Sequence, residues 1–254
     1  MRGLRAAVSL LTRVPVGPAG SGSADLARAV PWFPLVGALV GLALAGSYAG
    51  LLLVAPPFVA AGLTLGLSLF LTGALHEDGL ADTADALGEA RNKEDALRIL
   101  NDPAHGTYGV LSIVLSVILR VAALAALDGW TAVAVLPGAH ALSRGGAVVL
   151  LGALPPAAEE GLGASYATAT TRREVAGGIT GSLAAGLLAL GGWVLPAVLL
   201  AALGTGAVGV LSMRRIGGIT GDVLGAAQQV VENLVLLLGA AAVAGGWPSS
   251  AWWR

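Results

Sequence analysis

The stretch WFPLVGALVGLALAGSYAGLLLV, Trp32–Val54, contains no charged residue and is long enough to cross a membrane as one helix. A spanning helix needs about 20 consecutive, predominantly apolar residues. A second charge-free interval, Gly177–Met213, is too long for one span and has Gly191, Gly192 and Pro196 near its middle, which predicts two helices joined by a hairpin. The other predicted spans are Phe58–Leu75, Thr107–Leu127, Thr131–Leu151 and Val223–Gly246. The sequence therefore predicts an all-α, polytopic membrane bundle of seven helices, or six if the 177–213 pair is partly re-entrant.

The amino-acid composition agrees with a membrane protein. Hydrophobic residues make up 56% of the 254 residues and charged residues 11%, whereas soluble domains carry about 25% charged residues. The 38 glycines fit closely packed transmembrane helices, because small residues let helix backbones approach one another. The same close packing between two chains would allow a homo-oligomer. The net charge of −1 gives no sign of a nucleic-acid partner, and the lack of cysteine excludes disulfides and thiol chemistry.

Lysine and arginine residues near the ends of the spans predict the orientation of the chain, since cytoplasmic loops carry an excess of them. A cytoplasmic N-terminus places three polar segments on the cytoplasmic side, namely residues 1–30, 76–106 and 152–176. In the first segment, Leu4, Val8 and Leu11 form one apolar helical face, which predicts an interfacial helix, with a frayed basic tail as the alternative. We expect a single domain, residues 1–254, in the inner cell membrane with its active site facing the cytoplasm.

The segment HEDGLADTAD, residues 76–85, is the strongest chemical signal in the sequence. Asp78, Asp82 and Asp85 have the spacing i, i+4 and i+7, which puts three carboxylates on one face of a helix, with Glu77 beside them. Like charges arranged in this way at a membrane border repel one another unless a cation neutralises them. Mg²⁺ or Mn²⁺ suits ligation by carboxylates, so the segment predicts a divalent metal site. The alternative is a solvated acidic loop.

Charged residues inside the predicted spans are further candidates, because such residues are rare in membranes and usually functional. Glu232 could pair with Arg120 or Arg144, and its helix also carries Gln228, Gln229 and Asn233, which suggests a lined cavity. Arg144 is either a contact for a phosphate or partner, or a side chain that extends to the membrane surface.

Two polar segments outside the spans have both a functional and a structural interpretation. Asp222 begins a predicted helix, where it could act in the site or simply cap the helix. The segment Asn101–Gly109 leads into the third span, and its glycines would let backbone N–H groups approach an anion. A loop punctuated by proline and glycine explains that segment equally well.

The motifs of this chain resemble those of the cobalamin synthase family, also called adenosylcobinamide-GDP ribazoletransferase. The matching stretches cover nearly the whole chain in the family's order: TRVP (12–15), WFPLVG (32–37), HEDGLADTAD (76–85), Asp102 with GTYG (106–109), and GGITGD (217–222). The HEDG block is highly specific, whereas the glycine blocks alone would be weak. Residues 101–105 read NDPAH where the family pattern leads us to expect an arginine, which puts a phosphate role for that loop in doubt.

The resemblance implies a membrane-embedded, Mg²⁺-dependent phosphotransferase. Its substrates would be adenosylcobinamide-GDP and α-ribazole or α-ribazole 5′-phosphate, and it would release GMP. The implied metal ligands are Glu77, Asp78, Asp82 and Asp85. The implied catalytic residues are Asp82, Asp85 and Asp222, with Asp85 taking the proton of the nucleophile by analogy with the Asp-Gly…Asp…Asp motif of CDP-alcohol phosphotransferases. The implied contacts to substrate and cofactor are Arg13, His76, Thr107 and Arg144, with the two arginines at phosphates.

Two alternatives come from other functional classes. A CDP-alcohol phosphotransferase acting on lipid head groups would carry an arginine soon after Asp78-Gly79, but Leu80-Ala81-Asp82 follows. A small ion-coupled transporter would place its charges near the bilayer midplane, whereas most charges here cluster at one border.

Overall fold

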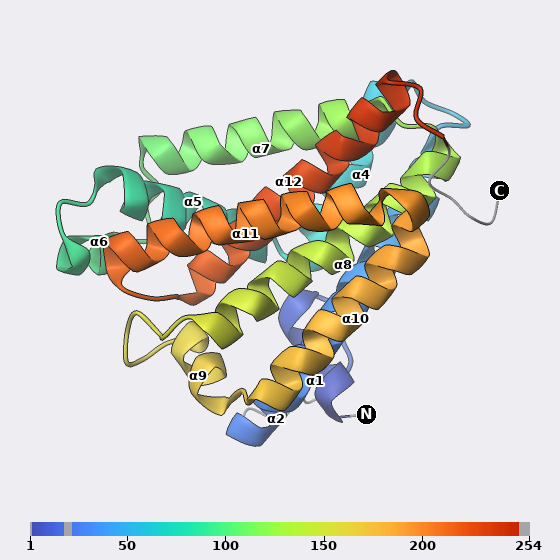
Figure 1. Cartoon of the computed structure of the whole chain (residues 1–254). Helices are drawn as coiled ribbons and strands as arrows, with labels where there is room; N and C mark the ends of the chain where they lie inside the picture. Colours follow the sequence, from blue (N-terminus) through green and yellow to red (C-terminus); the bar gives the residue numbers. More distant parts are fainter. Residues whose placement is uncertain (1, 18–21, 249–254) are drawn as a thin grey trace.

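The structure, a computed structural model, describes residues 2–17 and 22–248 and is built from α-helices throughout this part of the chain (Figure 1). Those parts of the predicted 1–30 segment and 1–254 domain that fall on residues 1, 18–21 and 249–254 lie outside the described residues. The helices are α1 (Arg2–Leu11), α2 (Ser23–Ala29), η1 (Val30–Trp32), α3 (Phe33–Leu51), α4 (Pro57–Thr72), α5 (Leu75–Glu89), α6 (Lys93–Ile99), α7 (Thr107–Ala125), α8 (Gly129–Ala153), α9 (Leu162–Ala169), α10 (Arg172–Leu190), η2 (Gly191–Trp193), α11 (Val194–Ile216) and α12 (Gly221–Ala244).

Most of the apolar helices match the predicted spans closely; the exception is the predicted span Phe58–Leu75, where α4 ends at Thr72 and passes as a span only together with α5. By length and composition, five helical stretches among the described residues can cross a membrane, or six if the bent pair α4–α5 counts as one span. One of the five is the 45-residue stretch Arg172–Ile216, which at a rise of about 1.5 Å per residue is about twice as long as a bilayer core is thick. The chain breaks this stretch at Gly191–Trp193, and α10 and α11 diverge from that point, so the predicted hairpin is confirmed (Figure 1). The total of seven spans and the cytoplasmic N-terminus stay predictions.

A sharp corner separates α4 from the acidic segment. The two helices are bent by 89° at their junction, where Gly73 and Ala74 have φ values of 67° and 56°. The left-handed conformation suits glycine, which has no Cβ to clash with the backbone. Beyond this corner the chain is helical again, and α5 and α6 occupy most of the polar segment 76–106.

The segment 152–176 is also more ordered than a loop. It contains the end of α8, the short helix α9 and the start of α10. The Ala157 N–H donates to the Ile219 carbonyl, and the Ile219 N–H donates to the Pro155 carbonyl, both at 2.9 Å. These bonds form an isolated parallel β-bridge between Pro156 and Ile219, which fixes this segment to the turn before α12.

Helix α8 runs through the centre of the bundle and packs against α3, α10 and α12. Its contact with α3 depends on Gly37 and Gly41, which are one helical turn apart. A Cβ at Gly37 would lie 2.5 Å from the His140 carbonyl oxygen, and one at Gly41 would lie 2.6 Å from that of Leu136. The two backbones approach closely because neither glycine has a side chain, as is usual for helices packed in membranes.

The N-terminal residues form a helix, as their apolar spacing predicts. Helix α1 buries Gly3, Ala6, Ala7 and Leu11, and it packs beside α2 and α3. Residues of α1 belong to the same hydrophobic cluster as residues of α6 and α9. The short helices α1, α2, α6 and α9 therefore gather at one end of the bundle, and the α10–α11 junction lies at the other (Figure 1).

Candidate active site

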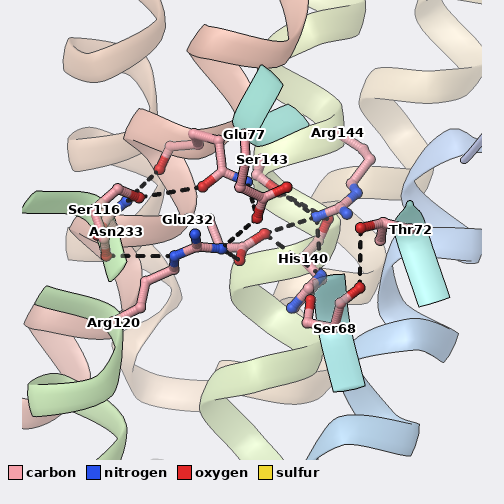
Figure 2. A network of polar contacts seen from close by, with 11 residues as sticks. Ser68, Thr72, Glu77, Ser116, Arg120, His140, Ser143, Arg144, Glu232 and Asn233 are labelled. Carbon is pink, nitrogen blue, oxygen red and sulfur yellow. Dashed lines mark hydrogen bonds and ion pairs between the residues drawn. The ribbon is translucent and has the colours of Figure 1, made fainter. Parts of the chain in front are cut away.

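Four helices bring a network of buried charges together in the interior of the bundle. Glu77 on α5, Arg120 on α7, Arg144 on α8 and Glu232 on α12 have side chains that are at most 7% exposed. Figure 2 shows Arg120 and Arg144 approaching Glu232 from opposite sides. Arg144 Nη1 lies 3.0 Å from Glu232 Oε2, and Arg120 Nη1 lies 3.4 Å from Glu232 Oε1. The predicted pairing of Glu232 is confirmed, and it involves both arginines rather than one.

Polar side chains hold the two arginines in place. Arg120 Nη1 also donates to Glu77 Oε1 at 2.8 Å, and Gln229 Nε2 donates to the same oxygen at 3.1 Å. Arg144 Nη1 donates to Ser143 Oγ and contacts His140 Nδ1, both at 2.9 Å. Buried charges are costly unless they are paired and hydrogen-bonded, which this network achieves for most of its atoms.

The acidic helix α5 presents its carboxylates in different directions. Asp78 and Asp82, one turn apart, face the same histidine: His105 Nε2 lies 3.6 Å from Asp78 Oδ1, and His105 Nδ1 lies 3.1 Å from Asp82 Oδ1. The Asp78 side chain is 63% exposed and that of Asp82 15%. Asp222, at the start of α12, is close enough for its negative charge to repel that of the Asp82 carboxylate. Three aspartates and one histidine therefore form an open cluster at the surface.

The other two carboxylates of the predicted metal set are bound elsewhere. Glu77 turns inward to Arg120, because consecutive residues on a helix point about 100° apart. Asp85 accepts the N–H groups of Gly106 at 2.6 Å and Gly109 at 2.7 Å, and so caps the start of α7. Within the described part of the chain, no group of three or more His, Asp or Glu side chains is arranged to hold a metal ion. The four predicted ligands do not converge, and metal binding stays a prediction.

A cavity with a volume of about 360 Å³ opens beside these groups, at the end of the bundle where α1, α6 and α9 lie (Figure 1). Part of its lining is polar and includes His76, Asp78, Arg144, Asp222 and Gln228. Most of the rest is apolar, with leucines from several helices and one aromatic side chain each from α3 and α9. The apolar and aromatic lining residues are Leu10, Leu11, Phe33, Leu75, Leu97, Leu100, Leu151, Leu162, Tyr166 and Leu224.

Tyr166 on α9 packs its ring against Phe33 on α3, edge to face, with ring centroids 5.7 Å apart. Burial raises the pKa of Tyr166 to about 12, so its phenol stays protonated at physiological pH. The cavity therefore combines apolar and aromatic surface with charged groups of both signs, which is typical of sites for small-molecule ligands.

Comparison with known proteins identifies the family. The family model described as cobalamin-5-phosphate synthase matches residues 3–241. This chain belongs to the cobalamin-5-phosphate synthase family. Relatives named adenosylcobinamide-GDP ribazoletransferase include one from Bradyrhizobium diazoefficiens, 43% identical over 94% of this chain and 93% of that protein. Others come from Rhizobium etli, at 42% over 91% and 93%, and Ralstonia nicotianae, at 42% over 92% and 93%. No solved structure matches.

Membership of the cobalamin-5-phosphate synthase family makes this protein a transferase of cobalamin biosynthesis. The family match also favours the ribazoletransferase interpretation over the two alternatives, a lipid head-group phosphotransferase and an ion-coupled transporter. The matched residues 3–241 include the cavity, the acidic cluster and the buried network.

In this member of the cobalamin-5-phosphate synthase family, the predicted substrate contacts fall into two groups: those that line the cavity and those that do not. His76 and Arg144 line the cavity. Arg13 and Thr107 do not: the Arg13 N–H donates to the Leu71 carbonyl at 2.7 Å and its guanidinium lies against Gly73, at the corner before α5. Thr107 is exposed at the first position of α7.

Several residues of the site are not predicted from the sequence. His105 comes from a loop, and its position between Asp78 and Asp82 depends on how α7 packs on α5. His140 and Ser143, which contact Arg144, lie in an otherwise apolar span. The sequence does contain a signal for the contact of His140 with Arg144: the two residues are four apart in one predicted helix, so they share a helix face.

Proposed function

We propose that this chain is an adenosylcobinamide-GDP ribazoletransferase with α-ribazole or its 5′-phosphate as acceptor. The hydroxyl oxygen of the acceptor ribose forms a bond to the phosphorus on the cobinamide side of the pyrophosphate. The bond from that phosphorus to the bridging oxygen breaks, GMP leaves with the oxygen and its electron pair, and the hydroxyl proton passes to a base. The observation that carries the proposal is a cavity lined by Arg144 and His76 beside the aspartate cluster, in a chain of this family.

Mg²⁺ or Mn²⁺ fits the carboxylate chemistry of the acidic cluster, although no three of its side chains are arranged as a ligand set among the described residues. Asp78, Asp82 and Asp222 place three negative charges close together, with His105 as their partner from the loop before α7. Oxygen ligands are those that Mg²⁺ prefers, and a bound metal would supply positive charge to the pyrophosphate. Glu77 and Asp85 could join only by leaving Arg120 and the α7 backbone. We therefore favour Asp78 and Asp82 as ligands, with Asp222 next to them.

The residues of this chain have distinct roles in the proposed reaction. Arg144 lines the cavity, and its guanidinium would bind a phosphate there. Asp222 lines the same cavity at the start of α12 and would accept the hydroxyl proton, since it lies where an acceptor in the cavity meets the acidic cluster. Asp85 is the alternative base, but both of its oxygens already accept backbone hydrogen bonds.

The proposed location is the inner cell membrane, with the cavity opening to the cytoplasm. Supporting this, the basic pairs Arg172–Arg173 and Arg214–Arg215 begin α10 and end α11, away from the α10–α11 junction (Figure 1). Lys93 and Arg98 lie on α6, which contributes to the cavity. An excess of such residues marks the cytoplasmic side of a membrane protein.

The reaction is tested with the whole protein purified and reconstituted in bilayers. Adenosylcobinamide-GDP and α-ribazole, with or without its 5′-phosphate, are supplied with Mg²⁺ or with a chelator, and GMP and the joined corrinoid are measured. We expect equal amounts of both products with Mg²⁺, loss of both with chelator, and loss of both in Asp82→Ala. Glu94→Ala on the exposed face of α6 is the matched control and should keep full turnover. A folded wild-type protein that gives neither product contradicts the proposal.

A further inference from the structure

Two buried hydrogen-bond donors in the same cavity have no partner. Arg144 Nε and Gln228 Nε2 make no hydrogen bond, although each residue is only 2% exposed. Both residues line the cavity beside Asp222. An unsatisfied buried donor costs free energy that a bound acceptor would recover, so two of them in one cavity indicate a site for an anion.

One terminal nitrogen of the Arg144 guanidinium is already bound. Its Nη1 contacts Glu232, His140 and Ser143 at 2.9 to 3.0 Å. These contacts set the orientation of the planar guanidinium before any ligand arrives, while Nε stays free. Prior orientation reduces the entropy lost on binding, which is how such groups contribute affinity.

The size and walls of the cavity restrict which anion it takes. Its volume of about 360 Å³ is near the lower end of the range for small-molecule sites, and a corrin ring with its side chains would not fit. Leu11 on α1, Phe33 on α3, and Leu97 and Leu100 beside α6 also line the cavity and form its apolar wall, whereas Arg144 and Gln228 belong to its polar lining. A molecule with a flat apolar base at one end and a phosphate at the other matches both walls.

We propose that this cavity is the subsite of the acceptor nucleotide, in which Arg144 and Gln228 bind the 5′-phosphate of α-ribazole 5′-phosphate and the leucine wall holds its benzimidazole base. This inference rests on the proposed function. It assigns the larger, corrin-bearing substrate to the open side of the cluster, where Asp78 is exposed. Unphosphorylated α-ribazole would leave the two donors unpaired and should bind more weakly.

The test compares two acceptors in wild type and in Gln228→Leu. We expect wild type to have a lower KM for α-ribazole 5′-phosphate than for α-ribazole. Gln228→Leu should raise the KM for the phosphorylated acceptor by about 10- to 100-fold and leave the KM for α-ribazole nearly unchanged, because a hydrogen bond to a charged group is lost for one acceptor only. Arg144→Lys should shift the same ratio, since lysine keeps the charge but not the planar donors.

Controls separate this inference from stability and from the reaction itself. Thr205→Val is the matched control: Thr205 Oγ1 is also buried without a partner, but Thr205 does not line this cavity, so the ratio of the two KM values should stay as in wild type. If Gln228→Leu does not fold, Gln228→Asn, shorter by one methylene, replaces it. Calorimetry with each acceptor alone measures binding without turnover. Wild type that binds both acceptors equally, or a Gln228→Leu ratio like that of wild type, overturns the inference even when turnover is normal.

Discussion

Glu232 illustrates how a single carboxylate organises the interior of this protein. It accepts a hydrogen bond from Arg144 on one side and forms an ion pair with Arg120 on the other. Arg120 also donates a hydrogen bond to Glu77. Two arginines and two glutamates balance in formal charge. Removing one partner of a buried pair leaves the other uncompensated, which costs more than the pair itself contributes. In the proposed function, Glu232 is therefore a positioning residue that acts on the cavity through Arg144.

Variants of Asp85 can separate its observed role as a cap of α7 from its predicted role as the catalytic base. Because its carboxylate accepts the N–H groups of Gly106 and Gly109, we expect Asp85→Ala to lose about 1–2 kcal/mol of stability, the usual cost of losing a helix cap. Asp85→Asn keeps one acceptor oxygen and should lose less, and its folded fraction should keep turnover. Thermal unfolding in detergent and the reconstituted assay measure the two quantities. Loss of turnover in Asp85→Asn with an unchanged melting temperature would favour the role as base.

At the scale of elements, the crossing of α5 and α12 decides where the aspartates meet. The two helices touch at Gly79, where an added Cβ would lie 2.8 Å from the Asp222 carbonyl oxygen and 3.0 Å from its Cα. Gly79 follows Asp78 directly, so the same contact places the acidic face of α5 next to Asp222. The glycine of the HEDG motif thus determines how closely the aspartates of α5 approach Asp222.

Gly79→Ala tests this contact. The new methyl group meets backbone atoms, which cannot move aside as a flexible side chain would, so we expect a loss of about 1–3 kcal/mol in stability and a larger loss of turnover. Gly62→Ala on α4 is the matched control, because a Cβ there meets nothing within 4 Å. Thermal unfolding and turnover are measured for both variants. Normal turnover in Gly79→Ala would mean that the aspartates do not depend on this crossing.

At the scale of the whole molecule, the two ends of the bundle differ in chemistry. One end carries the cavity, the acidic cluster and the basic residues of α6, α10 and α11. The other end has short connections such as Leu52–Pro56, where Leu53 and Val54 are more than 80% exposed. An asymmetry of basic residues such as this one is what orients a chain in a membrane.

The chain has no cysteine, which allows a direct test of its orientation. We expect Glu94→Cys, on exposed α6, to react with a membrane-impermeant maleimide only when the cytoplasmic side is accessible. Leu53→Cys should react from the opposite side in intact cells. Labelling in spheroplasts and in inverted vesicles distinguishes the two sides. Reaction of Glu94→Cys in intact spheroplasts would reverse the proposed orientation and place the cavity outside.

The sequence alone predicts the helical bundle, because the length of each apolar stretch and its lack of charge can be read without knowing what the stretch packs against. Trp32–Val54 and the hairpin within 177–213 are found in the structure nearly as predicted. The spacing of Asp78 and Asp82 on one helix face and the pairing of Glu232 are also predicted, since both follow from helical periodicity and the cost of an unpaired charge in a membrane.

The tertiary structure alone decides which of those groups share a site. Local spacing makes Asp78, Asp82 and Asp85 equivalent, yet Asp85 caps α7 while His105 faces the other two. Neither arrangement can be read from the sequence, because both depend on the packing of α5 against α7. The cavity is a product of the same packing, since helices far apart in the chain each contribute one part of its wall. Periodicity fixes what one helix presents, but only the contacts between helices determine what each side chain meets.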